Sequence, residues 1–397
     1  PPPPPHFQAE DGIRDEASCL VGSEMCIKRQ SLPRVWLLMG HKAGDNSQVQ
    51  ALADSLGWPC EIKRFVYHPY ELITNRLLGA TLAGVDRKKS SNLEAPWPDL
   101  VITAGRRNEP VARWIARQAG GKVRLVHIGR PWASPGYFDL IISTPQYQLE
   151  EYPNVISNSL PLHGITDSRL AAAKALWEPR LRHLQRPYCA VLIGGNSGPF
   201  VFTADKGERM GLALNTLVRE IGGTALITDS ARTPADFLDA FTARYELPAY
   251  IHRWVPGGED NPYVAYLALA DSIVVTGESM SMLTEASATR KPLYIFDPGD
   301  DLSCNRCREQ AGWWRYRHNF RFKPLSHRIA MHIGPRRMRR DVGAIQDAMV
   351  KSGRAVWLGS PFPAGLQIPP AGDLERATAG VKALFGRTED RIPAGDS

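Results

Sequence analysis

Residues Asp271 to Asp297 read DSIVVTGESMSMLTEASATRKPLYIFD, and the order of apolar runs and turn residues in them predicts the fold class. The apolar run at 272–275 predicts a buried strand, Gly277 and Ser279 supply a turn and a helix cap, and the helix should run to about Thr289. Pro292 then opens a second apolar run at 293–296. A strand, a helix and another strand in this order are typical of a parallel α/β sheet.

The start of the predicted helix suits an anion. The helix begins beyond the carboxyl end of a strand, where free backbone N–H groups and the positive dipole end favour a phosphate. Glu278, Ser281 and Glu285 are spaced to share one helix face, with Glu285 roughly 6–9 Å along the axis from the first turn. That is about the reach from a diphosphate to its ribose hydroxyls. The alternative without a ligand is an ordinary turn followed by a solvated glutamate.

The rest of the chain reads as two series of strands alternating with helices, which implies right-handed crossovers. A break at Trp177 to Pro187 separates them. We therefore expect an α/β fold with two Rossmann-like, doubly wound parallel-sheet domains facing across a cleft. The expected boundaries are 31–180 for an acceptor domain, 188–330 for a donor domain, and 331–397 for a C-terminal helix and a partly disordered tail.

The first 30 residues bear on where the folded chain begins, and the composition bears on which partners it could bind. Residues 1–30 resemble translated sequencing-adapter reads and lack the apolar core of a signal peptide, so we expect them to be an artefact. The net charge of +7 permits a nucleotide, a phosphorylated glycan, an anionic lipid or a nucleic acid as partner. Basic and aromatic residues interleave only at 313–317, so nucleic acid is not expected.

Cysteine usage bears on metal binding and location. Cys304 and Cys307 have zinc or redox spacing, but no second pair follows them, so we expect no metal site. The few cysteines suit a reducing cytoplasm. No run of ~18 apolar residues is present, so no membrane-spanning segment is expected.

Several motifs together resemble a known family. They are GDNSQ at 44–48, AGRR at 104–107, IGGNS at 193–197, SARTP at 230–234 and VTGESMSM at 275–282. The combination is similar to the mitochondrial-fission "elongated mitochondria" family, whose bacterial members are similar to GT-B nucleotide-sugar glycosyltransferases. The resemblance implies a GT-B-like fold and, for bacterial members, sugar transfer. In one departure, Gln146 and Tyr147 stand where many relatives have a His-Asp pair.

The strand ends and the resemblance together predict a donor site. We expect the backbone of the 194–197 loop to approach the diphosphate, Arg232 to neutralise phosphate charge and act as leaving-group acid, and Glu285 to bind the ribose. The full predicted set is Gly194, Gly195, Asn196, Ser197, Arg232, Trp254, Val255, Gly277, Ser279, Ser281 and Glu285. The alternatives are a plain strand-to-helix turn at 194–197, a surface arginine at 232 and a core aromatic at 254.

The acceptor side is predicted from the first series. Asp45 is the first candidate for a general base and His41 the second, although Asp45 fits equally a cap of a helix beginning near Ser47. Arg106 and Arg107 follow another strand, where they would bind an acidic acceptor or the donor phosphates. The arginines at 336–340 form a basic cluster suited to anionic lipid, although a solvated charge run is the commoner meaning.

These features predict a metal-independent glycosyltransferase with no cofactor beyond its nucleotide-sugar co-substrate. The acceptor would be a cell-envelope glycan or a lipid-linked molecule. The expected location is the cytoplasm, with peripheral contact at the inner face of the cell membrane. One alternative is a non-catalytic module of the same fold that binds a protein partner and keeps a relict nucleotide pocket. Another is a sugar epimerase, which needs carboxylates placed for elimination and re-addition.

Overall fold

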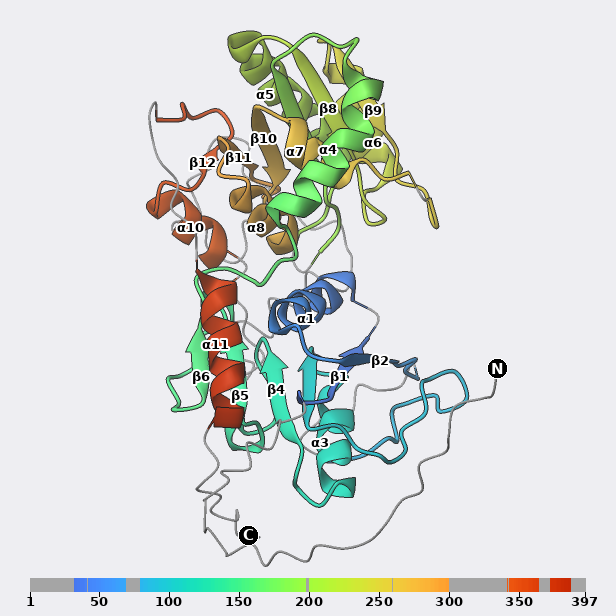
Figure 1. The fold of residues 1–397 in the computed structure, drawn as a ribbon. Helices are drawn as coiled ribbons and strands as arrows, with labels where there is room; N and C mark the ends of the chain where they lie inside the picture. Colours follow the sequence, from blue (N-terminus) through green and yellow to red (C-terminus); the bar gives the residue numbers. More distant parts are fainter. Residues whose placement is uncertain are drawn as a thin grey trace, which may run out of the picture. The chain divides into compact units, whose positions relative to one another are not determined.

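The computed structural model describes residues 32–40, 42–68, 79–197, 200–258, 260–299, 341, 343–363 and 372–386. Within these ranges the strands form two six-stranded sheets, and every neighbouring pair of strands is parallel. The first sheet has the order β2-β1-β3-β4-β5-β6 and the second has the order β12-β11-β10-β7-β8-β9 (Figure 1). In each sheet later strands are added on both sides of the first one, which is the doubly wound pattern.

The first sheet is built from the N-terminal half of the chain and one returning helix. Its strands are β1 (Val35–Met39), β2 (Cys60–Arg64), β3 (Leu100–Ala104), β4 (Arg124–Ile128), β5 (Leu140–Ser143) and β6 (Val155–Ser157). Its helices are α1 (Ala43–Leu56), α3 (Glu109–Gln118), the short η1 (Pro135–Tyr137) and η2 (Pro145–Tyr147), and α11 (Asp373–Gly386).

The second sheet follows the same plan. Its strands are β7 (Tyr188–Leu192), β8 (Thr224–Thr228), β9 (Ala249–His252), β10 (Ser272–Thr276), β11 (Leu293–Phe296) and β12 (Val356–Trp357). The helices associated with it are α4 (Asp167–Leu181), α5 (Ala204–Ile221), α6 (Ala235–Arg244), α7 (Tyr263–Leu269), α8 (Met280–Ala288) and α10 (Ala344–Lys351).

Both faces of each sheet are buried. In β7, Tyr188 and Leu192 enter one apolar cluster, while Cys189 and Val191 enter another on the opposite face. Alternate residues of β1 divide in the same way between two further clusters. Strand side chains alternate between faces, so a sheet covered on both sides requires the continuous apolar runs seen in the sequence. The predicted class, α/β with two Rossmann-like doubly wound sheets, is confirmed.

The connection between the two sheets differs from the expected break at Trp177. Helix α4 continues through Pro179 to Leu181, because Trp177 and Leu181 are both buried in an apolar cluster of the second sheet. Pro179 lacks an N–H donor but lies in the last turn, where its loss affects a single helical hydrogen bond. The apolar anchors therefore outweigh the helix-breaking residue.

The chain returns to the first sheet through α11, which the sequence analysis did not predict. This helix packs against α1 and β5 (Figure 1). The Asp373 carboxylate accepts hydrogen bonds from the backbone amides of Ser159 and Leu160, both at 2.9 Å. The hydroxyls of Ser55 and Thr378 are 2.8 Å apart. A C-terminal helix was expected within 331–397, and α10 (Ala344–Lys351) also lies in that range.

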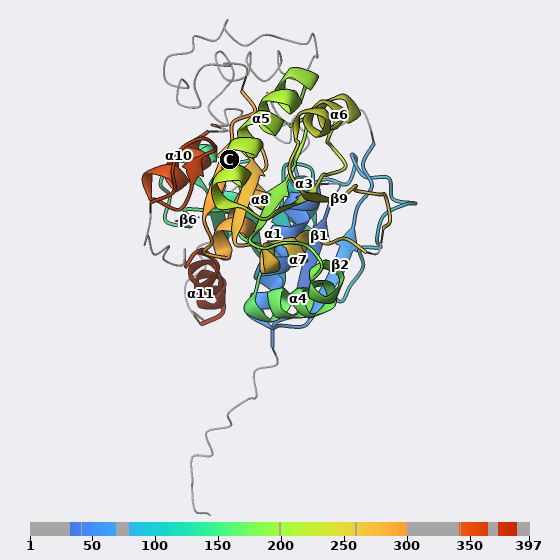
Figure 2. The same cartoon turned by 90° about the horizontal axis from the view of Figure 1, so that it is seen from above.

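Helices α5 and α6 lie side by side on the second sheet (Figure 2). A methyl group added at Gly207 would lie 2.1 Å from the carbonyl oxygen of Phe237, and one at Gly211 would lie 2.9 Å from that of Phe241. These two glycines therefore set the close spacing of the helices.

None of the helices in the described ranges combines the length and the apolar character that crossing a bilayer requires.

Candidate functional site

The candidate donor site lies where the order of the second sheet reverses. Strand β7 pairs with β10 on one side and with β8 on the other, so β7 and β10 flank the switch point. Ligands of open parallel sheets bind in the crevice at the carboxyl ends of such strands. Three loops meet there: 194–197 after β7, 229–234 after β8 and 277–279 after β10.

Glu278 joins these loops, in a position that the sequence analysis did not predict. It was expected on a helix face with Ser281 and Glu285, but α8 begins at Met280 and Glu278 precedes it. Its carboxylate turns inward and its Oε1 accepts a hydrogen bond from the Gly195 amide at 2.7 Å. The side chain has no exposed surface. Glu278 is therefore a buried bridge between two strand-end loops.

The backbone amides of the 194–197 loop are all engaged within the chain. Gly194 N donates to Thr276 Oγ1 at 2.8 Å, and Gly195 N donates to Glu278. Asn196 N donates to the Arg232 carbonyl and Ser197 N to that of Phe200, both at 3.1 Å. Side chains and loop carbonyls of the chain therefore already accept from these four amides in this structure. Whether the loop binds a donor stays a prediction.

Gly195 allows two loops to touch. A methyl group at this position would lie 2.1 Å from the Arg232 carbonyl oxygen and 2.6 Å from the Thr233 amide nitrogen. Both atoms belong to the backbone, so a side-chain rotation cannot relieve the overlap. At Gly194 the same addition would lie 1.8 Å from Glu278 Oε1. The glycine pair is needed for packing at the switch point, whatever it binds.

We expect Gly195→Ala to destabilise the fold by about 1–3 kcal/mol, the usual cost of overpacking. Gly386→Ala is the matched control, because the added methyl there meets no other atom of the described residues within 4 Å. Chemical denaturation of both variants measures the difference in the free energy of unfolding. Equal stability of Gly195→Ala and the wild type would show that the loops do not pack as described.

Arg232 supplies the positive charge of the site. Its guanidinium lies 3.8 Å from Glu278 Oε1 and donates to the Asn196 carbonyl oxygen at 3.3 Å. The side chain is 43% exposed, so it is accessible to a ligand from solvent. The structure thus places Arg232 against the 194–197 loop, and its role with phosphate stays a prediction.

Burial dominates the electrostatics of Glu278. Desolvation raises the pKa of its carboxyl group from an ordinary 4.5 to about 7, although the Gly195 hydrogen bond, Arg232 and Thr276 act in the opposite direction. Near neutral pH this group is thus divided between its charged and neutral forms. Strongly shifted carboxyl groups of this kind are concentrated at functional sites.

Glu285, the predicted ribose ligand, lies on α8 and is half-buried. Its Oε2 accepts a hydrogen bond from the hydroxyl of Tyr263, which lies on α7. Burial raises the pKa of Glu285, while the Tyr263 hydrogen bond and Arg169 oppose that shift. One oxygen of the Glu285 carboxylate is therefore already hydrogen-bonded within the protein.

The remaining candidates for donor binding lie after strands β9 and β10 of the second sheet. Ser279 is the N-cap residue of α8, as predicted, but its hydroxyl makes no capping hydrogen bond. Gly277 N donates to the Phe296 carbonyl, and Ser281 lies in the first turn of α8. Trp254 and Val255 follow β9 and are 37% and 59% exposed, which excludes the core alternative for Trp254.

On the first sheet, Asp45 also lies at a switch point, between β1 and β3. Helix α1 begins at Ala43 and Lys42 is its N-cap, so the alternative of Asp45 as a cap of a helix at Ser47 is wrong. The Asp45 carboxylate lies against Gly105, where an added methyl would be 2.6 Å from its Oδ2. The loop closes because Asn46 exchanges two 2.9 Å hydrogen bonds with the Gly40 backbone. The role of Asp45 as a base stays a prediction.

The two arginines after β3 lie against aromatic rings. Arg106 is 4.9 Å from the ring centre of Trp132, and Arg107 is 5.9 Å from that of Tyr67. Their predicted roles with an acceptor or phosphate stay predictions. His41, Asp300, Asp301, the cysteine pair at 304–307 and the arginines at 336–340 lie outside the described residues.

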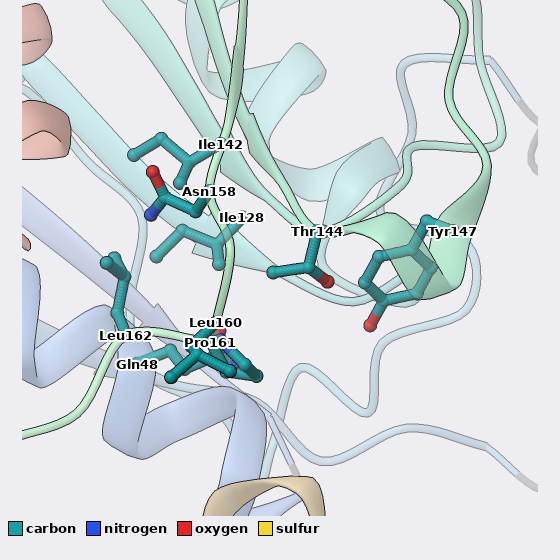
Figure 3. A pocket seen from close by; sticks show the side chains of 10 residues that line it. Gln48, Ile128, Ile142, Thr144, Tyr147, Asn158, Leu160, Pro161 and Leu162 are labelled. Atoms are coloured by element: carbon teal, nitrogen blue, oxygen red, sulfur yellow. The ribbon is translucent and has the colours of Figure 1, made fainter. Parts of the chain in front are cut away.

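A small pocket opens beside Tyr147, at the ends of β4 and β5 (Figure 3). Tyr147 lies at its edge near Thr144, and Gln48 of α1 also lines it. The pocket has room for a water-sized group, which is less than a sugar ring needs.

Within the described ranges, no three His, Cys, Asp or Glu side chains are grouped to hold a metal ion.

No direct signal in the sequence indicates that the Glu278 side chain turns inward. The available signal was indirect: an acidic residue directly after a strand and turn, before the helix has begun. The contact of Thr276, the last residue of β10, with the Gly194 amide was also not predicted. Strand periodicity does not indicate which polar side chain accepts a hydrogen bond from a loop amide.

Comparisons with known proteins show which family the chain belongs to. The family model for Mitochondrial fission ELM1 matches residues 43–313. An uncharacterized protein of Rickettsia prowazekii (strain Madrid E) is 26% identical over 298 residues, which are 66% of this chain and 83% of that protein. The mitochondrial fission protein ELM1 of Arabidopsis thaliana is 27% identical over 242 residues. This match covers 55% of the chain and only 56% of the plant protein.

Solved structures are similar at a lower level. A glycosyltransferase from Rickettsia africae ESF-5 is 10% identical with a TM-score of 0.45, covering 90% of this chain and 100% of that one. The UDP-GlcNAc 2-epimerase from Neisseria meningitidis is 12% identical with a TM-score of 0.46, covering 89% and 100%. Likeness at this level does not identify a reaction. The family model, by contrast, spans more than half of the sequence, and the chain therefore belongs to the Mitochondrial fission ELM1 family.

Proposed function

We propose that this chain is a nucleotide-sugar glycosyltransferase that binds its donor at the carboxyl edge of the second sheet. The observation that carries the proposal is the meeting of three strand-end loops at the β7–β10 switch point, around buried Glu278 and exposed Arg232. Such a point is where open parallel sheets bind ligands. The acceptor would be a cell-envelope glycan or a lipid-linked molecule, and contact with an anionic membrane belongs to the same proposal.

Different residues at this edge of the sheet would bind different parts of the donor. Arg232 and the N-terminus of α8 supply positive potential for the diphosphate and for the charge that develops on it as the sugar leaves. Glu285, half-buried on the same helix, would accept hydrogen bonds from the ribose. On the first sheet, Asp45 would take the proton of the acceptor hydroxyl.

A second function is favoured by one specific observation. All four amides of the 194–197 loop have acceptors within the chain, as a pocket that no longer binds nucleotide would allow. The plant relative is named a mitochondrial fission protein. A non-catalytic module that binds a protein partner is therefore the alternative.

A thermal-shift screen with UDP-, GDP-, CDP- and ADP-sugars tests the proposal. A ligand at 100 times its dissociation constant stabilises the folded state by about 2.7 kcal/mol, which is readily measured as a higher melting temperature. Stabilisation by one nucleotide class, followed by transfer of labelled sugar to a membrane or envelope extract, is the expected result. No shift with any of the four classes would favour the non-catalytic module.

We expect turnover to need no divalent metal. Arg232 and the start of α8 already provide the positive potential that the departing diphosphate needs. Sugar transfer should therefore continue after dialysis against EDTA. Complete loss of transfer, restored by magnesium or manganese, would contradict this expectation.

A further inference from the structure

The Glu278 carboxyl group has an unused hydrogen-bonding position at the proposed donor site. Its Oε1 accepts from Gly195 N, but its Oε2 is buried and has no hydrogen-bond partner among the described residues. Native proteins leave few buried polar atoms without partners, and such an atom needs a physical reason. Because the Glu278 side chain has no exposed surface in this structure, a ligand provides the missing partner only by displacing the atoms that cover it.

The groups around Glu278 are mostly neutral. The loop after β7 presents the amides of Gly194 and Gly195, and β10 presents Thr276. Helix α10 contributes Gln346, whose side-chain amide donates to the Gly277 carbonyl. The charged group facing Glu278 is Arg232 from the loop after β8, at 3.8 Å and 43% exposed. One partly solvated cation is weak compensation for a fully buried carboxylate.

We propose that Glu278 binds the donor's diphosphate as a neutral carboxylic acid, taking up one proton from solvent when the nucleotide binds. This inference rests on the proposed donor site. A carboxylate and a diphosphate in contact with each other repel, and that repulsion favours protonation of the weaker acid. The nucleotide thereby selects the neutral form of Glu278.

The proton that is taken up on nucleotide binding has one available atom of Glu278 to bind. It adds to Oε2, which then becomes an O–H donor to a phosphate oxygen, while Oε1 continues to accept from Gly195 N. Arg232 is no longer opposite a carboxylate, so its guanidinium is released to the phosphate. Because burial already raises the pKa of Glu278 to about 7, protonation near neutral pH requires little free energy.

Nucleotide affinity should therefore depend on pH. Above about pH 7 the empty site is mostly deprotonated, and affinity should fall by up to about tenfold for each further pH unit. The number of protons taken up on binding should rise towards one over the same range. At pH 6 the group is already mostly protonated, so uptake by Glu278 should be small.

Isothermal titration calorimetry with UDP, GDP, CDP and ADP tests the inference. The tightest binder is titrated at pH 6, 7 and 8 in buffers of different ionisation enthalpy, which gives the proton uptake directly. Glu278→Gln keeps the acceptor for Gly195 N and removes the titrating group. Glu246→Gln makes the same change at an exposed residue that precedes β9, at the opposite edge of the sheet. Subtracting the Glu278→Gln uptake removes the contribution of the nucleotide's own phosphate.

The expected result at pH 8 is that the wild type and Glu246→Gln take up about one proton more than Glu278→Gln. Nucleotide binding with equal uptake in all three proteins would overturn the inference and leave the donor site standing. Wild-type affinity that does not fall from pH 7 to pH 8 would do the same without any variant. If the folded wild type bound none of the four nucleotides at any pH, the donor site and this inference would fail together.

Discussion

Glu278→Gln should make the folded chain more stable than the wild type at pH 8, by about 3 kcal/mol. The pKa of Glu278 is about 7 in the folded chain against an ordinary 4.5, and each unit is worth about 1.4 kcal/mol. The folded state therefore binds more protons than the unfolded state between these values. Stability from this group is fully present below pH 4.5 and is lost as pH rises through 7.

Glutamine has the same shape, accepts from Gly195 N through its amide oxygen, and carries no charge. The two proteins should thus be nearly equal at pH 4.5 and diverge towards pH 8. Urea denaturation at several pH values measures the difference in the free energy of unfolding. Glu246→Gln should show no such divergence, because Glu246 is 70% exposed. A Glu278→Gln variant that is less stable at pH 8 would contradict the buried, unpaired position of this carboxyl group.

Glu285→Ala should weaken nucleotide binding by about 1.5–3 kcal/mol, the range for a hydrogen bond to a charged group. Glu285 shares α8 with Ser281 and keeps its seven-residue separation from Pro292. Calorimetry with the nucleoside diphosphate that binds the wild type most tightly measures the loss of affinity.

The substitution also leaves the Tyr263 hydroxyl without its acceptor, which lowers stability independently of any ligand. Tyr263→Phe removes the same internal hydrogen bond and keeps the carboxylate. It should therefore share the loss of stability and bind nucleotide much more tightly than Glu285→Ala. If Glu285→Ala folds and binds as tightly as the wild type, Glu285 is not a ribose ligand.

The fold was predictable from local pattern to a large extent. Each central strand is a short apolar run because both faces of its sheet are covered, and the helix predicted to end near Thr289 does end at Ala288. The glycine pair at 194–195 also marks a real constraint. Its structural reason is the contact with Arg232 and Glu278, which lie far away in sequence.

The features that escaped prediction depend on long-range contacts. Glu278 turns inward because Gly195 N, 83 residues away, needs an acceptor. Helix α11 is fixed by Asp373, which accepts from amides more than 200 residues earlier, and its surroundings in sequence are rich in proline, glycine and charge. Helix α4 passes through Pro179 because Trp177 and Leu181 are buried in the second sheet. None of these contacts leaves a periodic signal in one segment.

An experimental structure of the chain with the nucleoside diphosphate that binds it most tightly would show directly whether the donor site exists. We expect phosphates at the β7–β10 switch point, within hydrogen-bonding distance of Arg232, Ser279 and Glu278 Oε2, and a ribose hydroxyl on Glu285. Phosphates bound elsewhere, with the contact between Arg232 and Glu278 unchanged, would contradict this placement of the donor.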